Sequence, residues 1–154
     1  GYQQTISQPY TVAFMTHLLD IKDGDKILEI GTGSGYQAAV LSKLAKEVYT
    51  IERIPELAER AKERLKKLGY KNVFVKIGQG EKGWKDKSPF DAILITAGVD
   101  NVPKALLDQL KEGGALVVPV GKGTDKIMTK LIKGKNNRIG KKEYGIFHFV
   151  PLIV

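Results

Sequence analysis

The sequence contains no cysteine, only two histidines and no long apolar run. Without cysteine, the chain has no disulfide framework, no thiolate metal site and no cysteine nucleophile, and we expect no bound metal. No stretch approaches the roughly 20 apolar residues of a membrane-spanning helix, and the first residues lack the charged-then-apolar pattern of a secretory signal. These absences predict a cytoplasmic protein with no membrane partner.

Acidic residues are outnumbered: 25 lysines and arginines face 17 aspartates and glutamates, for a net charge of +8 over 154 residues. An excess of this size suggests a nucleic-acid partner. The most one-sided segment, 122–142, holds eight basic residues, but no aromatic residue interrupts it to stack on a base. We therefore expect no nucleic-acid substrate, and we expect a monomer.

Short apolar segments alternate with amphipathic ones along the chain, which indicates βαβ units and a parallel sheet. A polar stretch, 134–142, then joins two strands in a predicted antiparallel hairpin. No linker or internal repeat is visible, so residues 1–154 are expected to form a single domain. The expected strands are 26–31, 48–52, 73–77, 91–96, 115–120, 127–133 and 144–150, and the expected helices are 9–19, 36–44, 55–68 and 103–110, the last ended by Gly113-Gly114.

The most informative stretch is 27–35, in which an apolar strand enters a turn formed by Gly31, Gly33 and Gly35. Such a turn lets a ligand lie against bare backbone at the start of the following helix. Its spacing departs from the dinucleotide pattern G-x-G-x-x-G. Glu29, two residues before the first glycine, does not favour a pyrophosphate but does favour a ligand with a cationic amino group. S-adenosylmethionine carries such a group, so the stretch predicts a methyl-donor site.

Further candidate donor-binding residues stand where the predicted strands end, because ligands of open α/β sheets bind at the carboxyl ends of strands. Glu52 ends the second strand, 17 residues after Gly35. A carboxylate there accepts hydrogen bonds from the ribose hydroxyls of an adenosine, and an ion pair with Arg53 is the alternative. Ser34 serves equally well as a helix cap, and a plain turn is the alternative at 78–80. The other candidates are Thr32, Ser34, Arg53, Gly78, Gln79 (for the adenine amino group), Gly80, Thr96 and Ala97.

Four stretches, 4–9, 28–36, 48–53 and 149–152, resemble the protein-L-isoaspartate O-methyltransferase family. The resemblance implies an α/β fold of the Rossmann-like class I methyltransferase type. Its seven-stranded sheet is mostly parallel, with a C-terminal antiparallel hairpin and helices on both faces. The implied reaction transfers a methyl group from S-adenosylmethionine to the free carboxylate of L-isoaspartyl residues in damaged proteins or peptides. S-adenosylhomocysteine is then the second product.

The resemblance also implies where the acceptor lies. Ser7 becomes the catalytic residue that orients the acceptor carboxylate, although it serves equally as the cap of helix 9–19. An acceptor carboxylate has a pKa of about 3–4 and is ionised at neutral pH, so in-line attack on the methyl group needs no general base. We therefore assign no catalytic role to His17 or His148. The implied acceptor-binding residues are Thr5, Ile6, Ser7, Gln8, Pro9 and Val150.

The chain departs from the family pattern in three ways. Gly-Gln-Gly at 78–80 stands where the family usually has Gly-Asp-Gly, a helical segment usually precedes the Thr-Ile-Ser motif, and members often continue past the position of Val154. A trimmed or engineered chain is therefore one interpretation. The alternatives are a methyltransferase for RNA or a small molecule, a donor-binding domain with little turnover, and an NAD-binding domain, which Glu29 disfavours.

Overall fold

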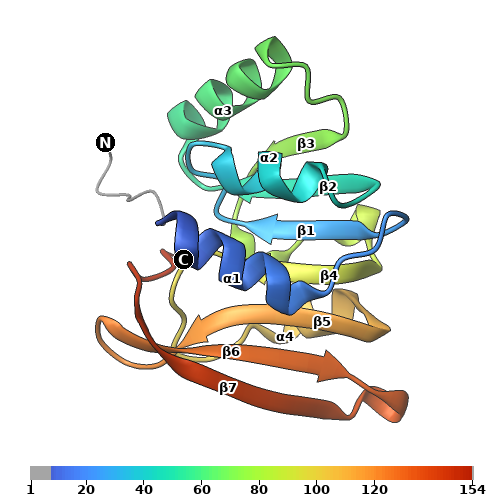
Figure 1. The fold of residues 1–154 in the computed structure, drawn as a ribbon, viewed down its shortest axis with the longest axis vertical. Helices are drawn as coiled ribbons and strands as arrows, with labels where there is room; N and C mark the ends of the chain where they lie inside the picture. The colour runs from blue at the N-terminus through green and yellow to red at the C-terminus, as the bar shows by residue number, and fades with distance from the viewer. Residues whose placement is uncertain (1–7, 154) are drawn as a thin grey trace.

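The computed structural model describes residues 8–153. Seven strands form one mixed sheet in the order β3-β2-β1-β4-β5-β6-β7 (Figure 1). The first five strands are parallel, β6 is antiparallel to β5, and β7 is antiparallel to β6. The fold class expected from the sequence is confirmed. The strands are β1 (Lys26–Ile30), β2 (Glu47–Glu52), β3 (Val73–Ile77), β4 (Phe90–Ile95), β5 (Leu110–Val120), β6 (Asp125–Lys133) and β7 (Ile139–His148).

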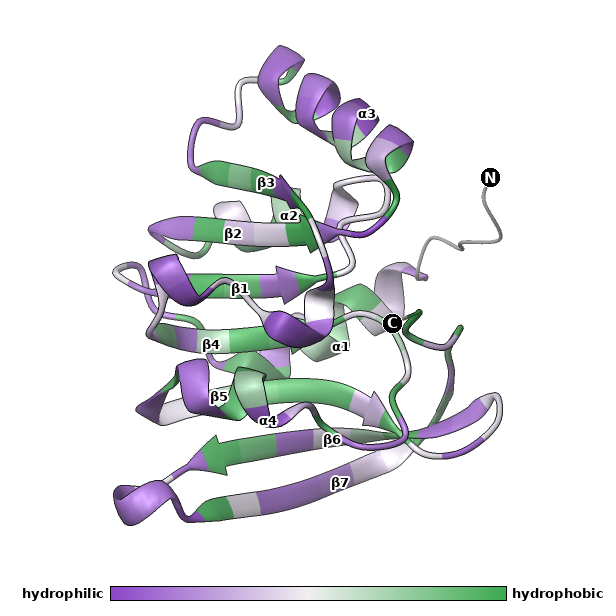
Figure 2. Ribbon diagram, turned by 180° about the vertical axis from the view of Figure 1, so that it is seen from behind, coloured by the Kyte–Doolittle hydropathy of each residue, from purple (hydrophilic) through white to green (hydrophobic). Residues whose placement is uncertain are grey.

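Helices cover both faces of this sheet (Figures 1 and 2). On one face, α1 and α2 pack against the centre of the sheet and α3 packs along β2 and β3, whereas α4 lies on the opposite face. The helices are α1 (Pro9–Leu19), α2 (Tyr36–Ser42), α3 (Pro55–Lys67) and α4 (Lys104–Gln109), with short 3₁₀ turns η1 (Gly80–Lys82), η2 (Lys85–Lys87) and η3 (Lys135–Asn137). No helix in the described part of the chain is long and apolar enough to cross a membrane.

The alternation of side chains along β1 divides the core into two layers. Ile27 is buried with α1 and α2 side chains, whereas Leu28 and Ile30 are buried with the side chains around α4. Figure 2 shows the central strands as hydrophobic ribbons, and β7 and the outer face of α3 as hydrophilic ones. Strands covered on both faces are expected to be nearly continuous apolar runs, as β1 and β4 are here.

Two expected strand starts are wrong by five residues each, at β5 and β7, whereas the other expected bounds lie within two residues of the observed ones. The helix near 103–110 does not run on to the glycine pair, because β5 begins at Leu110, directly after α4. Gly114 lies inside β5, where a Cβ atom would stand 2.6 Å from the carbonyl oxygen of Asp91. The pairing of β4 and β5 shifts register at this place, between Phe90 and Ala92. The glycine pair therefore permits a close backbone approach in an irregular strand rather than ending a helix.

The expected polar loop at 134–142 is also too long. β7 already begins at Ile139, which pairs with Lys133. The connection is a tight turn in which the N–H of Gly134 donates to the carbonyl of Arg138 at 2.7 Å. Asn136 and Asn137 adopt positive φ angles of 57° and 58° there, a conformation that asparagine tolerates. The lysines of 139–142 therefore belong to a paired strand, where polar side chains face solvent.

Candidate functional site

A cavity of about 490 Å³ opens at the carboxyl ends of β1, β2 and β4, and a smaller one of about 60 Å³ lies beside it. Gly31, Glu52 and Ala97 line both cavities, so the two form adjoining parts of one site. The larger cavity is lined by Gln8, Tyr10, Thr11, Val12, Gly31, Thr32, Gly33, Ser34, Tyr36, Gln37, Glu52, Thr96, Ala97, Ile146, Phe147, His148, Phe149 and Val150. The smaller one is lined by Ile30, Gly31, Ile51, Glu52, Arg53, Ile54, Gly80, Ala97, Pro151, Leu152 and Ile153.

The glycine turn between β1 and α2 forms one wall of the larger cavity, but four of its backbone N–H groups already have acceptors. Those of Gly31 and Thr32 donate to the carbonyl of Ile51, at 2.9 and 3.3 Å, and that of Gly35 donates to the carbonyl of Thr32 at 2.9 Å. The N–H of Gly33 donates to Glu52. A ligand at this wall therefore meets the Cα surface and the hydroxyl groups of the turn more than unused N–H donors.

Two glycines of the turn are required for different reasons. Gly31 has a φ of +97°, and a Cβ atom there would stand 2.5 Å from the hydroxyl of Thr96. That hydroxyl lies 2.8 Å from the carbonyl of Ile30 and 2.9 Å from that of Gly31, so it ties the end of β4 to the turn. Gly33, at a φ of +53°, has nothing within 4 Å of the place where its Cβ atom would lie. Gly31 therefore permits packing beneath the turn, and Gly33 leaves room beside it.

Glu52 is positioned at the junction of the two cavities by its own neighbours. It is only 7% exposed. Its Oε2 accepts the N–H of Gly33 at 2.8 Å, and its Oε1 accepts the N–H of Ile54 at 3.1 Å. A carboxylate has about four acceptor sites, so each oxygen keeps capacity for a ligand hydroxyl. The arrangement presents a fixed acceptor where the two cavities meet.

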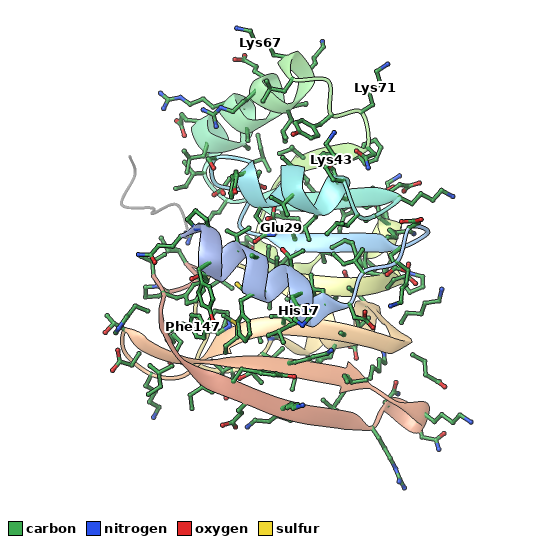
Figure 3. All side chains as sticks on the ribbon, in the orientation of Figure 1. His17, Glu29, Lys43, Lys67, Lys71 and Phe147 are labelled. Atoms are coloured by element: carbon green, nitrogen blue, oxygen red, sulfur yellow. The ribbon has the colours of Figure 1, made fainter. Side chains whose placement is uncertain are left out.

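Glu29 lies one layer below the cavity rather than on its wall, since it lines neither cavity. It is fully buried on the side of the sheet that α1 and α2 cover (Figure 3). Its Oε1 lies 2.6 Å from the hydroxyl of Thr50, which in turn lies 2.6 Å from the hydroxyl of Thr32 on the cavity wall. The pKa of Glu29 is raised to about 8, mainly by burial; the hydrogen bond from Thr50 opposes this shift, and the charge of Glu52 adds to it.

The other sequence-predicted donor residues divide into three groups. Thr32, Ser34, Thr96 and Ala97 line the larger cavity, and Arg53 and Gly80 line the smaller one. Three do not line either: Gly35, Gly78 and Gln79. Gln79 is exposed, and Gly35 packs under the side chain of Leu65 instead. The alternative role of Ser34 as a helix cap is wrong, because the N-cap residue of α2 is Gly35 and no side chain caps this helix. The Oγ of Ser34 instead accepts the N–H of Tyr36, the first residue of the helix, at 3.3 Å.

The acceptor-side predictions are only partly within reach of the structure. Those on Thr5, Ile6 and Ser7 lie outside the described residues. Gln8 and Val150 line the larger cavity, and Pro9 opens α1 at its rim without lining it. Val150 is held by the backbone, because its carbonyl accepts the N–H of Gly98 at 2.9 Å.

Several lining residues were missed because they come from the C-terminal strand, whose place in the fold is not a local property. Residues 149–152 return to the sheet beside Gly98, to whose carbonyl the N–H of Leu152 donates at 2.8 Å. An isolated parallel bridge, Gly98 with Pro151, results. This return brings Phe147, labelled in Figure 3, and its neighbours to the cavity. The only feature of the sequence that could have indicated this return is the family-like stretch 149–152.

An aromatic cluster extends from this wall to the surface. The ring of Phe14 stacks on those of Tyr10 and Phe147, with centroid distances of 6.1 and 5.6 Å, and meets the edge of Tyr144 at 5.9 Å. Such pairs contribute about 0.5–1.5 kcal/mol each beyond their buried area. The cluster therefore fixes α1 to β7 beside the cavity, which Tyr10 and Phe147 line. Within residues 8–153, no three histidine, aspartate or glutamate side chains come together as a metal site.

The strand order, the glycine turn after β1 and the strand-end carboxylate of β2 define a Rossmann-like methyltransferase. Solved structures share this architecture, among them a precorrin-6y C5,15-methyltransferase from Geobacter metallireducens, with a TM-score of 0.71 and 18% identity over 95% of this chain and 89% of that one. At that identity the likeness shows the fold alone.

Sequence comparison shows the particular family. The model of the protein-L-isoaspartate(D-aspartate) O-methyltransferase family matches residues 1–154, and the chain belongs to this family. It is 54% identical to the protein-L-isoaspartate O-methyltransferase of Dictyoglomus turgidum over 152 residues, which are 99% of this chain and 69% of the relative. A second relative, from Syntrophobacter fumaroxidans, is 54% identical over 99% of this chain and 71% of its own length.

Two solved structures of the family agree. One protein-L-isoaspartate O-methyltransferase matches with a TM-score of 0.89 and 32% identity over 96% of this chain, which spans only 48% of that protein. The other, a putative member from Plasmodium falciparum in complex with S-adenosyl-L-homocysteine, matches with a TM-score of 0.80 and 26% identity, over 99% of this chain and 78% of that one. The resemblance seen in the sequence is confirmed.

Proposed function

We propose that this chain transfers a methyl group from S-adenosylmethionine to the free carboxylate of L-isoaspartyl residues in damaged proteins or peptides. The observation that carries the proposal is the pair of adjoining cavities that meet at Glu52, inside a chain of this family. The relatives bear the name of this activity, and one solved structure of the family holds the demethylated product of the donor.

The residues present fit such a donor. Glu52 has unused acceptor capacity at the junction and holds the ribose hydroxyls. The smaller cavity, walled by Ile30, Ile51 and Ile54, suits the apolar faces of an adenine ring. The larger cavity, beside Thr32 and Ser34, holds the amino-acid end. When bound, S-adenosylmethionine supplies a methyl group on a positively charged sulfur.

The acceptor enters from the side of Gln8, Tyr10 and Val150. These residues line the larger cavity and not the smaller one, and Tyr10 among them is 68% exposed. We assign the neighbouring Thr5, Ile6 and Ser7 to the same end, with Ser7 orienting the acceptor carboxylate. Because that carboxylate is already ionised at neutral pH, no side chain needs to remove a proton. Orientation of two bound reactants supplies up to about 7–11 kcal/mol of the barrier reduction.

His148 is better explained as a rim residue than as a base. It lines the cavity, but its Nδ1 lies 2.9 Å from the Oδ1 of Asp125 and both side chains are exposed. The pair holds the start of β6 to the end of β7. We further propose a cytoplasmic location and a monomeric state, with isoaspartyl proteins as the partners.

A paired-peptide assay tests the function. The protein is incubated with methyl-labelled S-adenosylmethionine and an isoaspartyl peptide, in parallel with the same peptide containing normal aspartate. We expect label in the isoaspartyl peptide only, released as methanol by mild base because the product is an ester. Equal labelling of the twin peptides, or label in added RNA and not in peptide, would contradict the proposal.

Calorimetry with S-adenosylhomocysteine distinguishes an active methyltransferase from a donor-binding domain with little turnover and from an NAD-binding domain. Tight binding together with no methyl transfer to any acceptor would identify a donor-binding domain with little turnover. Binding of NAD but not of S-adenosylhomocysteine would exclude the donor assignment altogether.

A further inference from the structure

Glu29 presents a problem that the donor site alone does not explain. Its residue type favours a cationic ligand, yet it lies beneath the cavity and cannot touch what the cavity holds. Its side chain is fully buried, and its Oε2 has no hydrogen-bond partner within the described part of the chain. A buried polar oxygen without a partner costs about 1–3 kcal/mol, so its retention calls for a role.

The hydrogen-bond chain above Glu29 supplies a connection to the cavity. Glu29, Thr50 and Thr32 are joined by two contacts of 2.6 Å, and Thr32 belongs to the cavity wall. Each threonine hydroxyl has one proton and donates once. The direction of one hydrogen bond in the chain therefore decides the direction of the other.

The chain has two polarities. When Glu29 is ionised, Thr50 donates to it, Thr32 donates to Thr50, and the Thr32 oxygen has only lone pairs left for the cavity. When Glu29 is protonated, the proton belongs on Oε1, where it meets Thr50, because on Oε2 it would have no acceptor. Thr50 then donates to Thr32, and the Thr32 proton is free.

The charged groups around Glu29 are compatible with both its ionised and its protonated state. Glu52 is the charge that acts on Glu29 from β2, and burial favours the protonated acid in the absence of a cation. The residues beside Glu29 on the adjacent strands, Thr50 and Leu94, carry no charge. The remaining titratable side chains on the elements packed against β1 are Tyr10 and His17 of α1, Tyr36 of α2, Glu47 and Tyr49 of β2, and Asp91 of β4.

We propose that Glu29, acting through Thr50, sets the polarity of the Thr32 hydroxyl, so that the site exchanges the proton of Glu29 for the cationic amino group of its ligand. The inference rests on the proposed donor site and makes Glu29 a positioning residue in it. The proton passes to solvent when a ligand with an ammonium group binds. The ammonium then lies near a carboxylate and faces a hydroxyl oxygen that accepts.

Isothermal calorimetry at pH 7, in two buffers of different ionisation enthalpy, counts this proton. With a pKa of about 8 for Glu29, binding of S-adenosylhomocysteine is expected to release up to about 0.9 proton. 5′-Methylthioadenosine, which lacks the amino-acid end, is expected to release none. Glu29→Gln keeps the size of the side chain but cannot ionise, and Thr50→Val breaks the chain while leaving Glu29 in place.

Both variants are expected to abolish the proton release and to weaken S-adenosylhomocysteine about tenfold, while 5′-methylthioadenosine binds within about twofold of the unsubstituted protein. That second ligand also verifies folding. Binding of S-adenosylhomocysteine without proton exchange, or equal release by Glu29→Gln, would overturn the inference and leave methyl transfer untouched. Failure of the unsubstituted protein to bind S-adenosylhomocysteine would overturn the inference and the proposed function together.

Discussion

Glu52 is the residue on which the donor site depends most. Within the described residues, it is the one ionisable side chain that lines both cavities, whereas Arg53 lines only the smaller one. It is also the acceptor that holds the glycine turn through the N–H of Gly33. Loss of this carboxylate removes ligand hydrogen bonds and a support of the turn at once.

Glu52→Ala is expected to weaken S-adenosylhomocysteine about tenfold to a hundredfold, because hydrogen bonds to a charged group contribute about 1.5–3 kcal/mol. Ser7→Ala, the matched control on the acceptor side, is expected to leave that affinity within about twofold and to slow methyl transfer instead. Calorimetry and single-turnover rates separate the two effects. Loss of donor affinity in Ser7→Ala as large as that in Glu52→Ala would show that the division into donor and acceptor ends is wrong.

The buried acid makes stability depend on pH. Burial raises the pKa of Glu29 from 4.5 to about 8, so between these values the native protein binds more protons than the unfolded chain. The contribution of Glu29 to stability therefore falls as the pH rises from about 4.5 to about 8. Glu29→Gln removes this dependence.

The difference in Tm between Glu29→Gln and the unsubstituted protein, measured without ligand, is thus expected to grow by at least about 4 °C from pH 5 to pH 8 and then to level off. The variant is the more stable protein at high pH. Scanning calorimetry at four pH values measures the trend. A difference that stays constant, or that shrinks as the pH rises, would show that Glu29 is ionised in the empty site.

At the scale of elements, the junction of β1, β4 and the glycine turn is closely packed. The Thr96 hydroxyl occupies the space where a Cβ atom of Gly31 would lie. By contrast, the space beside Gly33 is open. The two glycines therefore form a matched pair, since both have positive φ and only one is crowded.

Gly31→Ala is expected to lower the free energy of unfolding by about 1–3 kcal/mol more than Gly33→Ala, because Thr96 must give up its hydrogen bonds in the first variant only. Both variants carry the cost of a left-handed conformation, about 1–2 kcal/mol. Urea unfolding measures the difference. Equal losses would mean that the end of β4 moves away from the turn without cost.

The elements themselves follow well from the sequence where the pattern is local. The bounds of helix 9–19 and strand 73–77 agree with the structure, because each is an apolar pattern bordered by proline, glycine or asparagine signals. The beginning of β5 could not be predicted in this way. Its pairing with Phe90 is a long-range contact, and the glycine pair has the same appearance in a strand irregularity as at a helix end.

The candidate site shows the same division. The turn and the strand ends could be placed because a parallel sheet brings them to one edge, as with Glu52, Thr96 and Ala97. The depth of Glu29 could not be predicted, since sequence alone does not reveal whether a carboxylate lies on the wall of a cavity or behind it. Phe147 and its neighbours reach the cavity only through the return of the last strand beside Gly98.

At the scale of the whole molecule, the proposed function assigns the donor end to the parallel part of the sheet, and the acceptor end to α1 and the antiparallel closing strand. The excess positive charge of +8 does not define the site, whose described wall carries Glu52 at its junction. β6 and β7, which carry many of the basic residues, are the strands farthest from β1 and its glycine turn in the order of the sheet.

The most direct test follows the acceptor peptide itself. An isoaspartyl peptide is incubated with the protein and excess S-adenosylmethionine, and its forms are separated by chromatography over time. We expect the isoaspartyl form to decline through a methyl ester and a succinimide while the normal aspartyl form accumulates, all dependent on the donor and reduced at subsaturating donor by Glu52→Ala. An isoaspartyl peptide that stays unchanged beside a protein that binds S-adenosylhomocysteine would contradict the account.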